Sequence, residues 1–194
     1  MKLAIFSDSH LGDNFGTERE KDAFSQASQA IQIALKEGVD AILIPGDLFD
    51  SSLPRQEVFH EAFELLTPCL KAQQSELKVQ FEKEREGISR PFNFLGIPVI
   101  ALHGNHEYRS KGYKNPIEVL QSAGFLLHVH AARAVLKKGN EILNVYGLSS
   151  VPEKYALEAL KAWNPKPESG EKNLLLMHQG IKEFLPGGDE MIAT

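Results

Sequence analysis

Short apolar runs alternate with amphipathic helical stretches along this chain, and that alternation restricts the possible folds more than any other feature. We expect buried strands at residues 2–7, 41–45, 97–102 and 173–177. The first helix is expected at residues 20–37, where apolar and small residues recur close to every 3.6 positions and Gly38 supplies a stop. Strands that alternate with helices predict an α/β fold with largely parallel strand pairs.

The remaining segments extend this expected order of elements. Further helices are predicted at residues 57–66, 116–122 and 152–163, with a highly charged one at 70–85 after a break or kink at Pro68. Strands are predicted at residues 125–130, 134–137 and 142–146, the last two joined as a hairpin that turns at 138–140. The hairpin indicates antiparallel pairing, so we expect a mixed sheet or two sheets.

Composition favours one globular domain inside the cell. The chain has 194 residues, of which 42% are hydrophobic, and this suffices for a sizeable core. No apolar run approaches the roughly 18 to 20 residues of a membrane span, and residues 1–9 lack the pattern of a signal peptide. Cys69 is the only cysteine, which excludes an internal disulfide and fits a reducing compartment. We therefore expect a cytoplasmic protein that is not attached to a membrane.

Residues that bind metals or catalyse reactions follow each of the four main predicted strands. They are Asp8 and His10 after the first, Asp47 and Asp50 after the second, Asn105 and His106 after the third, and His178 after the fourth. In open α/β sheets, ligands bind outside the carboxyl ends of the strands. Gly46 and Gly104 stand just before two of these groups and permit close backbone approach. The pattern predicts that distant parts of the chain converge at one edge of the sheet.

Each of these groups alone has an ordinary structural explanation. A single Asp-X-His or Gly-Asp is typical of a turn, and a histidine after an apolar strand is typically buried and hydrogen bonded. Four such groups at four strand ends favour a joint site instead. Carboxylates, imidazoles and an amide oxygen, without thiolates, suit Mn, Fe or Zn ions. With Asp47 as the carboxylate shared between two ions, the set predicts a two-metal centre that acts on a phosphoester.

The same motifs resemble the signature of the calcineurin-like metallophosphoesterases. They are Asp8-Ser9-His10, Gly46-Asp47-Leu48-Phe49-Asp50, Gly104-Asn105-His106-Glu107 and His178-Gln179-Gly180. In detail they are similar to the double-strand-break repair branch, which comprises SbcD-like bacterial nucleases and meiotic-recombination-type nucleases of archaea and eukaryotes. The resemblance covers the chain from residue 3 to about residue 180. It implies an α/β sandwich of two mixed β-sheets flanked by helices (α/β/β/α), here incomplete at the C-terminus.

The resemblance also implies a role for each motif residue. Two divalent metal ions are expected, most simply Mn²⁺, the first held by Asp8, His10 and Asp47 and the second by Asp47, Asn105 and His178. His106 would bind no metal; it would stabilise the transition state and protonate the leaving oxygen. The implied protein is a DNA nuclease with 3′ to 5′ exonuclease and endonuclease activity. It would act in double-strand-break repair as a homodimer, with an SMC-like ABC-type ATPase as partner.

The chain departs from this pattern in one respect. The family closes its metal site with a Gly-His-X-His motif well after the position of His178, and residues 179–194 do not contain one. His128 and His130 form a His-X-His pair, but they precede His178 and lack the glycine, so we interpret them as strand residues. We expect residues 1–194 to be the N-terminal and central part of a nuclease domain, without its C-terminal part or any DNA-capping domain, and poorly active alone. A degenerate paralogue is the alternative.

Supporting roles are assigned to residues near the motifs. Asp50 either orients a metal ligand or caps the following helix, and we favour the cap. The candidate DNA contacts are Tyr108, Arg109, Lys111 and Lys114, in a loop that either grips phosphates and bases or is an ordinary solvated loop. The net charge of −5 argues mildly against nucleic-acid binding. Metal-site carboxylates account for part of that charge, and the three cations of the loop are local.

Two amphipathic stretches are candidates either for the core or for a dimer contact. Their apolar residues are Val58, Phe59, Ala62, Phe63, Leu66, Ile117 and Leu120. Three functions remain open from the sequence. The first is a manganese-dependent DNA nuclease, the second a metallophosphoesterase for nucleotides or phosphoproteins, and the third a catalytically incomplete dimerisation or scaffold module.

Overall fold

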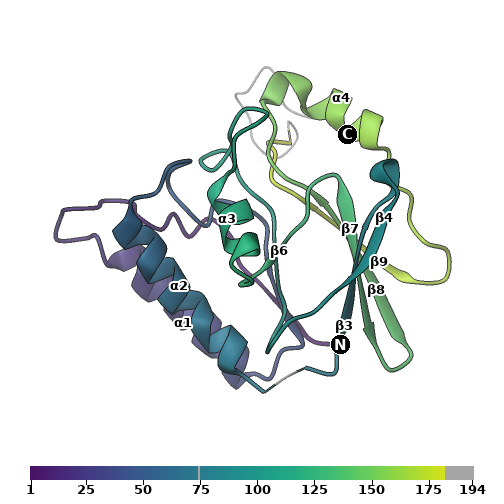
Figure 1. Cartoon of the computed structure of the whole chain (residues 1–194), viewed down its shortest axis with the longest axis horizontal. Coiled ribbons are helices and arrows are strands. Elements are labelled where there is room, and N and C mark those ends of the chain that lie inside the picture. The colour runs from purple at the N-terminus through teal and green to yellow at the C-terminus, as the bar shows by residue number, and fades with distance from the viewer. Residues whose placement is uncertain (74, 182–194) are drawn as a thin grey trace.

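Four of the predicted strands assemble into one parallel sheet. The computed structural model describes residues 1–73 and 75–181 (Figure 1). In the order β1-β2-β5-β6, the strands are β1 (Leu3–Ile5), β2 (Ala41–Ile44), β5 (Val99–Ala101) and β6 (Leu127–His128). All neighbouring pairs are parallel, so the carboxyl ends of these strands share one edge.

A second sheet of five strands packs against the first. In the order β4-β3-β7-β8-β9, its strands are β4 (Ile88–Phe92), β3 (Lys78–Lys83), β7 (Ala132–Lys138), β8 (Glu141–Leu148) and β9 (Lys172–Met177). Among the described strands of this sheet, only the β8–β9 pair is parallel. The hairpin between β7 and β8 turns through Gly139 and Asn140, because Lys138 pairs with Glu141, as predicted.

Helices flank the two sheets. They are α1 (Asp22–Lys36), α2 (Gln56–Lys71), α3 (Pro116–Ser122) and α4 (Glu153–Trp163). Figure 1 shows α1 and α2 side by side along the parallel sheet and α4 beside the second sheet. The predicted α/β/β/α sandwich is confirmed. Within the described residues one sheet is parallel throughout and the other is mixed.

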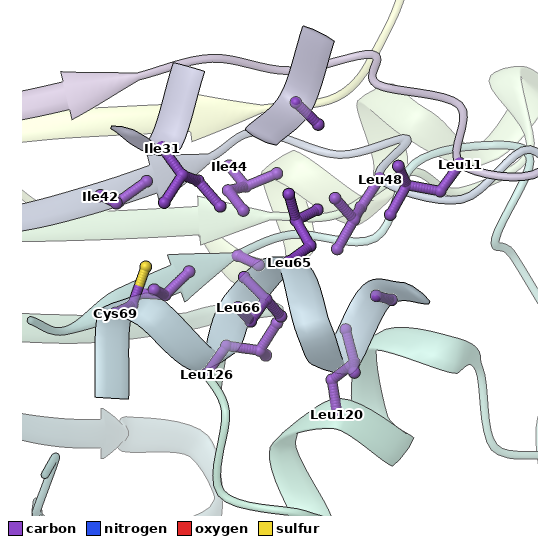
Figure 2. Close-up of a cluster of buried hydrophobic side chains, with 14 of the residues drawn as sticks. Leu11, Ile31, Ile42, Ile44, Leu48, Leu65, Leu66, Cys69, Leu120 and Leu126 are labelled. Carbon is purple, nitrogen blue, oxygen red and sulfur yellow. The ribbon is translucent and has the colours of Figure 1, made fainter. Parts of the chain in front are cut away.

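The core lies in two layers, and β2 separates them. Ile42 and Ile44 point into the layer beneath the helices, with Leu66 of α2 and Ile31 of α1 (Figure 2). Leu43 points into the layer between the two sheets. Because β2 is buried on both faces, it is apolar at all four positions, as strands of parallel sheets usually are. A strand held in this way fixes the position of the loop that follows it.

Two predictions about the central segment need correction. The break that was one of the two alternatives at Pro68 is absent, because α2 continues through Pro68 to Lys71. Residues 70–85 are not a helix: within the described part they include the end of α2, then β3 and the start of a short 3₁₀ turn at Glu84–Glu86. Val79 and Phe81 alternate towards the inter-sheet core with period two, and β3 pairs with both β4 and β7. The many charged residues of this segment made the apolar alternation hard to recognise in the sequence.

The described helices include none that is both long and apolar enough to span a membrane.

Candidate metal centre

Three loops that follow β1, β2 and β5 meet at one edge of the parallel sheet. The first two run side by side beyond their strands, because Asp8 N–H donates to Gly46 O (3.2 Å) and His10 N–H donates to Asp47 O (3.1 Å). Asp8, His10 and Asp47 all have positive φ, at 56°, 47° and 48°. This left-handed region costs a residue with a side chain about 1–2 kcal/mol. The fold therefore holds three of the predicted ligands in a strained backbone, as is common at functional sites.

Glycine is required at two positions beside these ligands. A Cβ on Gly104 would lie 2.0 Å from Asp47 Oδ1, and one on Gly46 would lie 2.4 Å from His178 Nδ1. Gly46 also has a φ of 114°, which side chains disfavour. The close approach that the sequence predicted at both glycines is therefore present.

The side chains of the predicted ligands converge around Asp47. Asp47 is buried, with 2% of the residue exposed. His178 Nε2 lies 3.3 Å from Asp47 Oδ2 and 3.1 Å from Asn105 Oδ1, while His10 Nε2 lies 4.0 Å from the same Asp47 oxygen. Asp8, Asp47 and His178 offer ligand atoms that all lie within 4.8 Å of one another. One carboxylate thus lies among donors from all four strand ends.

The hydrogen bonds of His178 fit a cation at this point. Its Nδ1 lies 2.9 Å from the carbonyl oxygen of Pro45, which only accepts, so Nδ1 carries the proton. The lone pair of a neutral Nε2 then faces the carboxylate of Asp47, and this arrangement needs a proton or a metal ion between them. Burial lowers the pKa of His178, but the hydrogen bond and the negative charge of Asp47 outweigh it and raise that pKa overall. The donor set is therefore suited to a divalent metal.

The pKa of Asp47 shifts in the complementary direction. Burial raises it, but the hydrogen bond and charge of His178, together with the N–H of His106, outweigh burial and lower the pKa below its ordinary value. The carboxylate is therefore ionised at neutral pH and available to a cation.

Asp50 contacts two histidines of the site. Its Oδ1 lies 3.1 Å from His10 Nδ1 and 3.2 Å from His106 Nδ1. These contacts leave Nε2 of His10 directed towards Asp47, in the carboxylate–histidine arrangement common behind metal ligands. The preference for Asp50 as a helix cap is wrong, because α2 begins at Gln56 with Arg55 as its N-cap.

His106 lies beside the proposed ligands and forms, with His10 and Asp50, a group of possible metal ligands that is separate from the group of Asp8, Asp47 and His178. Its Nδ1 is 3.2 Å from the backbone carbonyl oxygen of Asp50, and its ring centroid is 4.6 Å from that of His10. The side chain is 40% exposed, so Nε2 is the nitrogen that a substrate can reach. Its backbone N–H donates to Asp47 Oδ1 at 3.1 Å.

The sequence interpretation gave Glu107 no role, although it ends the Gly-Asn-His-Glu motif. Glu107 is fully buried, and its two oxygens accept hydrogen bonds from the N–H groups of Phe49 and Gly104, both at 2.8 Å. Burial raises the pKa of this carboxyl to about 7, although both hydrogen bonds oppose the shift. An acidic residue directly after the catalytic candidate was the signal that could have identified it.

A cavity of about 500 Å³ opens beside Asp8, Asn105 and His178. Tyr108 lines it, as do residues 150–153 and 177–180. Of the other candidate DNA contacts, Lys111 is exposed, Arg109 stacks over Tyr113 at 4.9 Å and Lys114 pairs with Glu118 at 2.7 Å.

The remaining candidates lie elsewhere. His128 ends β6, and its Nε2 is 2.9 Å from His103 Nδ1; neither His128 nor His130 belongs to the metal-binding groups formed by the described residues. In the two amphipathic stretches, the residues buried in the core are Val58, Ala62, Leu66, Ile117 and Leu120. Phe59 and Phe63 of α2 are only partly buried.

Comparison with known proteins places the chain in a family. Residues 1–192 match the calcineurin-like phosphoesterases. The DNA double-strand break repair protein Mre11 of Sulfurisphaera tokodaii is 32% identical over 190 residues, covering 95% of this chain and 42% of that protein. The corresponding values for Mre11 of Saccharolobus solfataricus are 30% over 189 residues, 96% and 43%.

A mammalian relative shows the same likeness. The double-strand break repair protein MRE11 of Mus musculus is 30% identical over 221 residues, covering 95% of this chain and 31% of that protein. The chain spans less than half the length of these relatives. The match along the chain, the two-sheet sandwich and the ligand cluster at the strand ends agree: this chain belongs to the calcineurin-like phosphoesterase family.

Proposed function

We propose that this chain provides the phosphodiester-cleaving site of a manganese-dependent DNA nuclease that acts in double-strand-break repair, as a 3′ to 5′ exonuclease and an endonuclease. The observation that carries the proposal is the convergence of Asp8, Asp47, Asn105 and His178 on one carboxylate-centred cluster. The likeness of the whole chain to double-strand break repair proteins supports DNA as the substrate.

The proposed ligands divide into two sets. Asp8, His10 and Asp47 would hold one ion, and Asp47, Asn105 and His178 the other. When bound, two divalent ions neutralise phosphate charge, activate a water molecule and orient an in-line displacement. Oxygen and imidazole donors suit Mn²⁺. The domain boundary is part of the proposal: further ligands, including the histidines of a Gly-His-X-His motif, would come from outside residues 1–181.

His106 is the proposed general acid. Asp50 holds its Nδ1 through the backbone carbonyl and the carboxylate, so the proton on Nε2 is free to move to the leaving oxygen of the phosphodiester. This transfer contributes typically about 10²- to 10⁴-fold to the rate.

The test compares His106→Ala with His60→Ala. His60 is an exposed histidine of α2 outside the site, so its loss controls for removal of an imidazole. In a longer protein that carries the Gly-His-X-His histidines, with Mn²⁺ and linear duplex DNA, His106→Ala should lose about 10²-fold or more in kcat, while His60→Ala should match the protein without either substitution. Cleavage of small phosphodiesters or phosphopeptides, with DNA left intact, would favour the broader phosphoesterase function instead.

DNA contacts are proposed for Tyr108, Arg109, Lys111 and Lys114. Tyr108 borders the cavity beside the cluster, where it can stack on a base, and Lys111 is exposed to a phosphate. Removal of one phosphate contact should lower the slope of log K against log salt by about one. Lys111→Ala therefore tests the loop by DNA-binding titrations at several salt concentrations.

The proposal extends to assembly and location. We propose a homodimer through the half-buried Phe59 and Phe63 of α2, an SMC-like ABC-type ATPase as partner, and a cytoplasmic, nucleoid-associated protein. Sedimentation of the unaltered protein and of Phe63→Asp tests the dimer; a dimer that is unaffected by the added charge would exclude this face.

A further inference from the structure

We propose that Glu107 is a positioning residue that clasps two ligand-bearing loops together and thereby sets the geometry of the metal centre. The inference rests on the proposed metal-dependent function of that centre. It assigns a task to a buried side chain that can itself reach neither solvent nor substrate.

The contacts of Glu107 join segments that lie far apart in the sequence. One oxygen accepts from the N–H of Phe49, which is 58 residues away in the loop after β2. The other accepts from the N–H of Gly104 and closes the turn that contains Asn105 and His106. In the described part of the chain, the loops after β1 and β2 are joined by backbone hydrogen bonds, whereas the loop after β5 is linked to residues 47–50 through side chains.

Among those links, the bond to Glu107 is the one that involves neither a proposed metal ligand nor the side chain of the proposed general acid His106. Asp47 also joins the two loops, through its bond from the N–H of His106, but its carboxylate is the expected shared ligand. A metal ion would draw on the same oxygens, so that bond cannot hold the loops independently of the metal. Glu107 can do so, because it is fully buried and is not a proposed ligand.

A carboxylate is the group that this position requires. Both partners are N–H donors, so both side-chain oxygens must accept. A glutamine supplies one accepting oxygen and sets its NH₂ group against the other N–H. Each buried N–H that is left without an acceptor costs about 1–3 kcal/mol. Glu107→Gln keeps the volume of the side chain and removes its charge. The glutamine can accept from only one of the two N–H groups, so one of the two loops loses its hydrogen bond.

The first experiment measures Mn²⁺ affinity by calorimetry at pH 8 on folded protein. Glu107→Gln is compared with Glu82→Gln, the same exchange at a partly buried residue of β3 that accepts from Arg133 Nε at 2.9 Å, away from the cluster. Loss of a group that supports metal ligands typically weakens binding about 10- to 100-fold. We expect such a loss for Glu107→Gln and less than about a twofold change for Glu82→Gln. A folded Glu107→Gln protein with unaltered Mn²⁺ affinity would overturn the proposal, as would an equal loss in both variants.

A second measurement needs no variant, in case Glu107→Gln does not fold. Hydrogen exchange followed by NMR on the unaltered protein should show strong protection of the Phe49 and Gly104 amides before any metal is added. Exchange at these two amides as fast as in the exposed loop around Lys111 would refute the clasp.

The clasp and the proposed substrate can fail separately. At saturating Mn²⁺, Glu107→Gln should lower kcat for the cleaved phosphodiester and leave KM unchanged, because Glu107 does not contact substrate. If Mn²⁺ affinity falls in Glu107→Gln while a longer protein that carries the Gly-His-X-His histidines does not cleave DNA, the clasp is supported and the DNA nuclease function is refuted. If that longer protein binds no Mn²⁺, both are refuted.

Discussion

Replacement of Gly104 by alanine tests whether the fit around Asp47 controls metal binding. The added Cβ would lie 2.0 Å from Asp47 Oδ1, 2.5 Å from its Cγ and 2.6 Å from its backbone nitrogen. Real Cβ contacts are essentially never shorter than 3.0 Å, so the carboxylate oxygen must retreat by at least about 1 Å in a closely packed interior. A metal site tolerates ligand displacements of only about 0.2 Å.

Two effects of Gly104→Ala are therefore expected. The free energy of unfolding should fall by about 1–3 kcal/mol, the usual cost of overpacking. Mn²⁺ affinity should fall by at least about 10- to 100-fold, the loss that follows when even the support of a ligand is altered. Urea unfolding measures the first effect, and calorimetric titration of the folded protein measures the second.

Gly147→Ala is the matched control. Its Cβ would lie 2.7 Å from Leu102 Cδ2 and 2.8 Å from Val129 Cγ1, between the sheets and away from the ligands. It should lose similar stability while its Mn²⁺ affinity stays unchanged. Equal affinity in Gly104→Ala and the unaltered protein, or an equal loss in both variants, would refute the reasoning.

Three further predictions concern the body of the fold. Burial lowers the pKa of His103 to about 4, whereas the unfolded chain takes up this proton near pH 6.5. The free energy of unfolding should therefore fall by about 1.4 kcal/mol per pH unit as the pH drops from about 6.5 to about 4, and this residue should cause no loss above pH 6.5. His103→Asn should show a correspondingly shallower dependence in urea unfolding between pH 7 and pH 5, and an unchanged slope would contradict the assignment. Burial raises the pKa of the Cys69 thiol to about 11, so a thiol reagent should label it only in denaturant; rapid labelling of native protein would show that α2 opens. Leu66→Ala, at a fully buried position (Figure 2), should cost about 2–5 kcal/mol in urea unfolding, whereas Ile33→Ala, 62% exposed on α1, should stay within about 0.5 kcal/mol.

Local patterns were sufficient to predict most elements. The helix expected at residues 116–122 is α3 with the same bounds, because Asn115 and Glu118 form a capping box that is visible in the sequence. The strand that became β2 is an unbroken apolar run with a glycine after it. In such segments the side chains that decide the structure are close together in the chain, so their spacing is informative.

The prediction of a helix at residues 70–85 is wrong for a physical reason. β3 is stabilised by pairing with β7, in which Val79 faces Leu136 across 57 positions of sequence, and no local pattern records that partner. The charges on its solvent face suggested a helix, while the apolar alternation that favours a strand is only a few residues long.

At the site, the sequence alone determined which kinds of atoms are present and that they follow buried strands; only the structure showed that His178 follows a strand of the second, mixed sheet. Residue types and the apolar pattern are properties of the local sequence, so Asp47 and His178 could be identified as candidate ligands before any contact was known. Only the tertiary structure decided which of these side chains contact each other. It turned Asp50 towards His10 and His106 instead of a helix end, and it buried Glu107 between two loops. Those contacts depend on the exact approach of strands that are far apart in the chain, which packing determines and spacing does not.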